Sequence, residues 1–136
     1  MTKHLISIFI AVLLGTPALS IVSASAPIPI EVFAPQYWQP LHSALISGTV
    51  KVRVDVDPAG TVLTAKAVKG SYAPLVPPSE TSARRWRFTP AQGSQTRSAI
   101  LVFEFILLSG GSSPDAVPVG TRFIPPYKVQ VIEVGP

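Results

Sequence analysis

The chain has no cysteine and only two histidines among its 136 residues. Without cysteine it has no disulfide, no thiol nucleophile and no thiolate metal site, so its hydrophobic core must hold the fold together unaided. His42, the only histidine after residue 4, cannot build a histidine-rich metal site and has no acid near it in the sequence to complete a catalytic triad. Neither a Gly-x-Ser-x-Gly element nor a phosphate-binding glycine loop is present. We therefore expect that the protein is not an enzyme and that it has no catalytic residues, no metal and no cofactor.

Charged residues are also scarce, at 13% of the chain, and their balance is mildly basic. Once Lys3 is set aside, ten of the eleven lysines and arginines remain against seven aspartates and glutamates, and the basic residues are scattered. A nucleic-acid surface needs a denser basic stripe, so no nucleic-acid partner is expected. Asp55 and Asp57 could form an acid/base pair, but they share a strand face with Lys51 and Arg53 and are better explained as surface charges.

The one long apolar run lies at the start of the chain. Lys3 and His4 precede the apolar residues 5–14, Pro17 follows them, and small residues continue to Ala26. This is the pattern of a secretory signal peptide, which we expect to span residues 1–24 and to be cleaved after Ala24. The alternative is an uncleaved membrane anchor, because residues 5–24 reach the roughly 20 residues that a bilayer requires.

The next residues predict an extended lead-in and a short helix. Residues 25–40 contain four prolines, each of which fixes φ and removes a backbone donor, so this segment is expected to be extended. Tyr37 and Trp38 are expected to pack on the domain. Residues 41–46 predict one or two helical turns that end before Gly48.

A β-hairpin and a helix follow. Valines at 50, 52, 54 and 56 alternate with charged residues, which predicts a half-buried strand, and residues 57–60 predict a tight turn into a second strand at 61–68. A helix is expected from Pro78 or Ser79, with Glu80 in its first turn, and ends before Pro90. Ala83 and Trp86 would share one face of it.

The remaining residues predict two more strands. Residues 98–108 are apolar at both alternating sets of positions, which is typical of a central or doubly covered strand. Residues 109–126 are expected to form a loop, and 127–134 a last strand in which Val129 and Val131 alternate with Gln130 and Ile132. The predicted fold is α+β, a small antiparallel sheet of three or four strands with two short helices packed on one face.

Three motifs carry a family resemblance. They are the hairpin at residues 48–62 (GTVKVRVDVDPAGTV), the aromatic and basic element at 82–91 (SARRWRFTPA), and the strand at 101–105 (LVFEF). In this order and spacing the chain resembles the C-terminal domain of the TonB energy-transducer family over residues 41–108. The resemblance implies two helices on a three-stranded antiparallel sheet, a periplasmic location, and contact with outer-membrane TonB-dependent receptors. It also implies that a partner strand pairs with an exposed sheet edge.

Two features depart from the family pattern. The leader looks cleavable, whereas family transducers keep a membrane helix at this position. Family transducers also carry a long Pro-rich spacer that crosses the periplasm, whereas residues 25–40 span only about 50 Å at roughly 3.3 Å per residue. We therefore predict a periplasmic module that binds receptors or other envelope proteins without the energy-coupling parts. The alternatives are a self-associating structural protein of the envelope, such as a homodimer, and a transducer anchored in the inner membrane and facing the periplasm.

The candidate partner-binding residues are basic side chains at the helix end and apolar residues of the last strand, namely Arg84, Arg85, Arg87, Val129 and Val131. The basic group also fits a solvated helix end that complements the helix dipole, and the last strand could instead close the sheet and block its edge. Trp86 and Phe88 could contact a partner but are better explained as core. The predicted core residues are Val50, Val52, Val54, Val56, Trp86, Phe88, Phe103 and Phe105.

Overall fold

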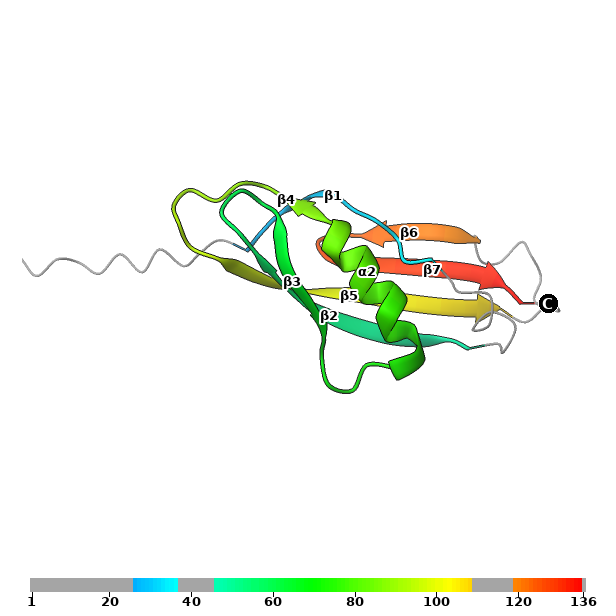
Figure 1. Ribbon diagram of the computed structural model, residues 1–136. Helices are drawn as coiled ribbons and strands as arrows, with labels where there is room; N and C mark the ends of the chain where they lie inside the picture. Colours follow the sequence, from blue (N-terminus) through cyan, green and yellow to red (C-terminus); the bar gives the residue numbers. More distant parts are fainter. Residues whose placement is uncertain (1–25, 37–45, 109–118, 136) are drawn as a thin grey trace, which may run out of the picture.

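The structure, a computed structural model, describes residues 26–36, 46–108 and 119–135. Within these residues a five-stranded sheet is crossed on one face by an α-helix, and a two-stranded ribbon lies beside the helix (Figure 1). This is the α+β class that the sequence predicts. The sheet is larger than the three or four strands expected, and the helix predicted at residues 41–46 lies almost entirely outside the described residues.

The hairpin is formed by β2 (Gly48–Val56) and β3 (Val62–Ala67), which pair antiparallel. The four alternating valines of β2 are completely buried. In the connecting turn Gly60 has φ +94°, and a Cβ atom there would lie 2.0 Å from the carbonyl oxygen of Phe88. Both the left-handed backbone and the close approach of another strand therefore require glycine at this position.

The helix α2 (Val76–Arg85) follows a short 3-10 turn, η1 (Ala73–Leu75). It begins two or three residues before the predicted start, so Glu80 lies after the first turn rather than within it, in contrast to the prediction. The helix ends at Trp86, whose ψ of 149° is extended. Arg87, predicted at the helix end, instead begins the two-residue strand β4 (Arg87–Phe88).

Strand β4 pairs antiparallel with β1 (Pro29–Glu31), which lies within the lead-in predicted as extended chain. The ribbon these two strands form also touches the hairpin, because Thr61 bridges Arg87 and the amide of Phe88 donates to the carbonyl of Gly60 at 2.9 Å. Two segments that are distant in the sequence are thus joined over one end of the sheet.

The central strand is β5 (Arg97–Leu108), which pairs antiparallel with β2 on one side. On its other side it pairs parallel with β7 (Lys128–Val134), and the strand order is β3-β2-β5-β7-β6. The predicted purely antiparallel sheet is therefore wrong. The chain leaves β5, forms the outermost strand first and then turns back, so that β7 fills the position beside β5 in the same direction as β5.

The outermost strand on this side is β6 (Gly120–Ile124), which pairs antiparallel with β7. Its residues were predicted to belong to the loop 109–126, and this prediction is wrong for 120–124. The sequence pattern that would predict this strand is weak, because the strand is short and is bounded by Gly120 and by the consecutive prolines 125 and 126. Glycine and proline are depleted in strands and typical of turns, so the residues that bound this strand indicate a loop.

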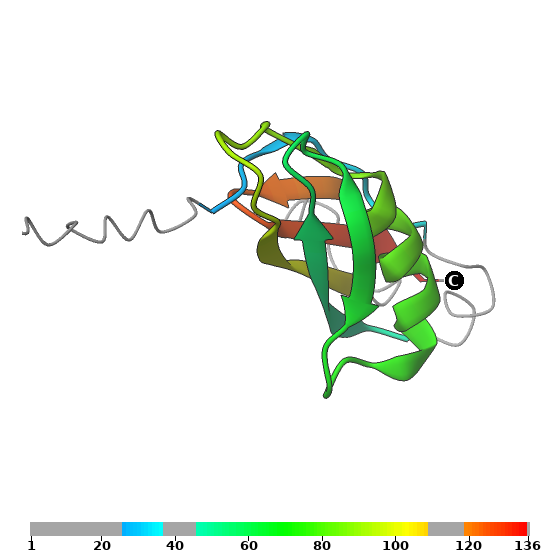
Figure 2. The ribbon, with the colours of Figure 1, turned by 60° about the vertical axis from the view of Figure 1, so that its left-hand side comes forward.

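The core lies between the sheet and the layer formed by α2 and the β1–β4 ribbon. Viewed after a 60° turn, α2 lies along one face of the sheet (Figure 2). All eight predicted core side chains are at most 1% exposed. The other buried apolar residues of this cluster come from β3, η1, α2, β5 and β7: Ala65, Leu75, Ala83, Ala99, Leu101, Val129 and Val131.

Candidate functional site

Trp86 connects the helix to the lead-in. Its indole is fully buried, and Nε1 donates a hydrogen bond of 2.9 Å to the carbonyl oxygen of Phe33. The hydroxyl of Ser82, one turn earlier on α2, donates to the same oxygen at 2.6 Å. Because two side chains of one helix converge on a single carbonyl, the lead-in is fixed over the helix end.

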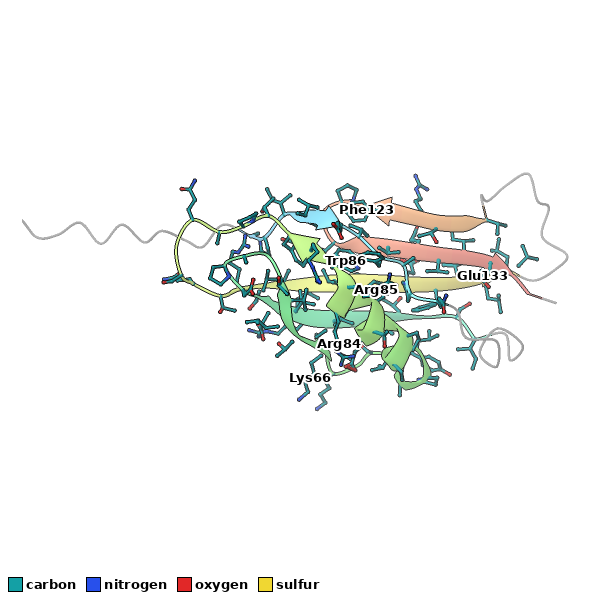
Figure 3. The ribbon with its side chains drawn as sticks, turned by 45° about the horizontal axis from the view of Figure 1, so that its top comes forward. Lys66, Arg84, Arg85, Trp86, Phe123 and Glu133 are labelled. Atoms are coloured by element: carbon teal, nitrogen blue, oxygen red, sulfur yellow. The ribbon has the colours of Figure 1, made fainter. Side chains whose placement is uncertain are left out.

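The same indole ring reaches the outermost strand. The ring centroid of Phe123 in β6 lies 6.2 Å from that of Trp86 at an interplanar angle of 77°, and Phe103 of β5 lies at 5.9 Å and 88°. These are edge-to-face arrangements, which aromatic pairs prefer. Figure 3 shows Phe123 beside Trp86. Phe123 keeps 40% of its surface exposed, so it attaches β6 to the core while leaving apolar surface open to solvent.

The outer edge of β6 is the candidate functional site. Among the described residues this strand pairs only with β7, and residues 120–123 are all exposed. An outermost strand carries a row of backbone N–H and C=O groups that can pair with an added strand, and its alternate side chains give specificity. The exposed Arg122 and Phe123 are the side chains available here for an acidic and an apolar contact.

The opposite outermost strand, β3, is more protected. The bridge between Thr61 and Arg87 covers its start, and α2 packs against it. Lys66 is exposed on it, and a lysine on an outer strand discourages pairing with another chain. Both outer strands in the described part of the sheet have exposed residues, but α2 packs against β3, so β6 is the less covered of the two.

The three candidate arginines, two in the last turn of α2 and one in β4, are exposed, but each contacts a group of its own chain. Arg84 Nη2 lies 3.8 Å from Glu80 Oε2, and the guanidinium of Arg85 lies 4.2 Å from the ring centroid of Phe33. Arg87 Nη1 donates to the carbonyl of Trp86 at 3.0 Å. In Figure 3 Arg84 and Lys66 lie together on one flank of α2, away from Phe123. The structure therefore does not gather the three arginines at the β6 edge.

Val129 and Val131 are not at an edge. They are 0% and 5% exposed, and their strand β7 is paired with β5 on one side and β6 on the other. The prediction that these residues accept a partner strand is therefore wrong. Alternating valines predict a strand and its buried face, but they carry no information about which strand becomes its neighbour.

No catalytic arrangement is seen among the described residues. They contain no group of three or more His, Cys, Asp or Glu that could hold a metal ion, and His42 lies outside them. Asp57 Oδ1 accepts the amide of Thr61 within the turn at 2.8 Å. Asp55 accepts hydrogen bonds from the hydroxyls of Ser98 at 2.7 Å and Thr64 at 2.8 Å, and these bonds, with the charge of Arg53, lower the pKa of Asp55. Both aspartates thus have structural partners.

Comparison with known families identifies the family of the chain. Residues 34–107, just over half of the chain, match the family described as Gram-negative bacterial TonB protein C-terminal. The chain belongs to the TonB C-terminal domain family. The match covers β2, β3, α2, β4 and nearly all of β5, while β6 and β7 lie beyond it. The comparison with curated proteins finds no significant match.

Family membership gives this chain a TonB-like role in the Gram-negative envelope. Members of the family act in energy transduction and binding rather than catalysis, and they interact with outer-membrane receptors. The described residues include no helix with the length and apolar character needed to cross a membrane. The strands β6 and β7 add to the family region the edge identified above.

Proposed function

We propose that this protein is a periplasmic TonB-like binding module. Its partner is an outer-membrane TonB-dependent receptor or another envelope protein, and it acts in support of transport across the outer membrane. The observation that carries the proposal is the exposed outer edge of β6 on a TonB C-terminal domain. A partner segment pairs its backbone with this edge and places side chains against Phe123 and Arg122.

Two proline variants test pairing at this edge, Thr121→Pro and Arg122→Pro. Along an antiparallel edge strand, successive backbone amides point alternately to the neighbouring strand and away from it. One of the two prolines therefore removes an amide needed by β7, and the other removes only an outward amide. The variant that retains the native thermal transition is the test protein, and the matched alanine variant at the same position is its control.

Binding is measured with labelled peptides from the N-terminal segments of TonB-dependent receptors, with scrambled peptides as a control. We expect the stable proline variant to lose binding by at least about tenfold, while its alanine control binds like the native protein. Hydrogen exchange with the peptide bound should protect residues 120–124. Protection confined to residues 62–67 would move the site to β3, and unchanged binding by the stable proline variant would contradict pairing at β6.

Residues 1–24, the predicted leader, lie outside the described residues. We propose that this leader is removed on export. Mass spectrometry of the protein purified from the envelope should give an amino terminus near Ser25. A retained leader would instead identify a transducer anchored in the inner membrane, facing the periplasm.

A second candidate function is self-association within the envelope. Exposed apolar side chains beside the β6 edge favour it, because Val119 and Phe123 are 57% and 40% exposed. An open edge with apolar neighbours can pair with a second copy of itself. Light scattering of the full mature chain distinguishes the two functions. A stable dimer that Arg122→Glu or the stable proline variant dissociates would favour self-association, and a monomer at high micromolar concentration would exclude it.

A further inference from the structure

A cavity lies at the end of the molecule where the β4–β5 loop meets the start of the lead-in. Its volume is about 630 Å³, which is within the range of ligand sites. The lining residues used in the argument below are Ile28, Pro90, Gln92, Ser94, Gln95 and Arg97. In Figure 1 the loop between β4 and β5 and the lead-in before β1 lie at the same end of the sheet. This cavity is separate from the edge proposed above for strand pairing.

Arg97 lines this cavity and is buried. It is the first residue of β5 and is only 6% exposed, because its side chain continues the buried row of Ala99, Leu101 and Phe103. One guanidinium nitrogen, Nη2, donates to the carbonyl of Thr89. Its Nε has no hydrogen-bond partner among the described residues. The ion pairs found in the described part of the chain do not involve Arg97.

This arrangement is unfavourable unless something else contacts the guanidinium. A buried charge without an opposite charge destabilises the fold, and so does a buried donor without an acceptor. The carbonyl of Thr89 offsets only part of this cost. A carboxylate matches the planar guanidinium because its two oxygens can accept two parallel N–H donors.

The rest of the lining fits the same ligand. It contains no acidic residue that would repel an anion. The amides of Gln92 and Gln95 and the hydroxyl of Ser94 can add neutral hydrogen bonds, while Ile28 and Pro90 give an apolar wall. We propose that this cavity binds a carboxylate group, with Arg97 as its charged partner. The carboxylate is either the free C-terminus of a peptide or an acidic side chain within one.

The probes are short acetylated peptides added to the full mature protein. One pair, Ac-Ala-Ala with a free carboxylate and the same peptide as its amide, tests the C-terminus. A second pair, Ac-Ala-Asp-Ala-amide and its Asn analogue, tests an acidic side chain. Binding is followed by NMR through the arginine Nε–H signals. We expect the Arg97 Nε–H signal to shift and gain protection from exchange with a carboxylate peptide but not with its amide or Asn counterpart.

Variants connect this response to Arg97. Arg97→Gln should weaken carboxylate binding by at least about tenfold. Arg53→Gln, which removes the same charge from an exposed strand position, should leave it unchanged. Gln95→Glu keeps Arg97 and alters only the exposed lining. It should also weaken binding by supplying a competing carboxylate, and it keeps the test valid if Arg97→Gln fails to fold.

Three results would overturn the proposal. The first is no response of the Arg97 signal to either carboxylate peptide at millimolar concentration, which would mean that water alone satisfies the guanidinium. The second is an equal response to the carboxylate and its uncharged counterpart. The third is unchanged binding by a folded Arg97→Gln protein. None of these outcomes depends on strand pairing at β6, so the two proposals succeed or fail separately.

Discussion

At the scale of single residues, the polar side chains matter most where they connect strands. Asp55 is the clearest case, because it lies on β2 and accepts hydrogen bonds from Ser98 on β5 and Thr64 on β3. The bond from Ser98 contributes most to lowering the pKa of Asp55, followed by the bond from Thr64. One carboxylate thus connects the three neighbouring strands on the exposed face of the sheet.

This geometry predicts how stability depends on pH. Because the pKa of Asp55 is lower in the folded than in the unfolded protein, the carboxylate stabilises the fold above the unfolded pKa of about 3.9. That stabilisation is lost as the pH falls from there through the folded pKa. Urea unfolding of the native protein and of Asp55→Asn should therefore differ most near pH 7, and the difference should shrink below about pH 4.

Ser98→Ala serves as the graded comparison, since it removes the largest contribution to the shift but keeps the carboxylate. Its pH dependence should fall between those of the native protein and Asp55→Asn. If the difference in the free energy of unfolding between the native protein and Asp55→Asn stays constant from pH 7 to pH 2.5, Asp55 does not contribute to the pH dependence of stability. Direct titration of the Asp55 carboxyl carbon by NMR checks the direction of the pKa shift independently.

Arg97 shows what residue-by-residue reading of the sequence misses. Arginine is rarely fully buried, so the sequence favours a surface position for it. The alternation of Ala99, Leu101, Phe103 and Phe105 nevertheless continues backwards to position 97. The alternation of the strand therefore places Arg97 on the buried face, so its burial can be predicted from the sequence pattern.

At the scale of elements, the sequence predicts strands far better than it predicts their neighbours. The valines of β2 and the doubly apolar β5 have strong periodic patterns, and both strands form. The valines of β2 are buried as predicted, and β5 is the central strand, although only one of its two apolar faces is buried. The position of β7 could not be predicted, because it depends on β6, whose five residues carry almost no strand signal. The sequence therefore points to Val129 and Val131 of β7 as the candidate edge and not to β6, which lies within the predicted loop 109–126.

The strand β6 is attached by its pairing with β7 and by one aromatic contact, and loss of that contact should have a local effect. Phe123→Ala removes the edge-to-face pair with Trp86. Such pairs contribute about 0.5–1.5 kcal/mol beyond burial, and Phe123 is 40% exposed, so we expect a loss of about 1–2 kcal/mol in the free energy of unfolding. Hydrogen exchange should accelerate mainly in residues 120–124.

Arg122→Ala is the matched control, since it removes a long side chain from the neighbouring exposed position of the same strand. It should change the free energy of unfolding by no more than about 0.5 kcal/mol. If Arg122→Ala and Phe123→Ala destabilise equally, the contact with Trp86 is not what holds β6. Faster exchange throughout β2 and β5 in Phe123→Ala would likewise show that the strand is not attached independently.

At the scale of the whole molecule, the family region and the folding unit have different boundaries. The family match ends at residue 107, near the end of β5, but the core continues into β7. Val129, Val131 and Ile132 are at most 5% exposed. Because β7 inserts between β5 and β6, it is part of the sheet interior and is not an appended tail.

This difference predicts that the family region alone is not a stable protein. A mature chain that ends at Leu108 loses the burial of three large side chains, which is worth roughly 5–9 kcal/mol before the ordering of the added residues is subtracted. Single domains have a total stability of about 5–15 kcal/mol. The truncated chain also leaves the edge of β5 unpaired beside Phe103 and Phe105. We expect it to lose its cooperative thermal transition or to aggregate, as followed by circular dichroism and light scattering.

Val129→Ala in the full chain separates a packing defect from the loss of the strand. It should lower the free energy of unfolding by about 2 kcal/mol while preserving a cooperative transition and a soluble protein. If the chain ending at Leu108 instead unfolds cooperatively at the native temperature, β6 and β7 add little to the fold and β5 itself would be an open edge. Partner pairing would then have to be sought on β5, because the position of β7 between β5 and β6 is what moves the accessible edge to β6.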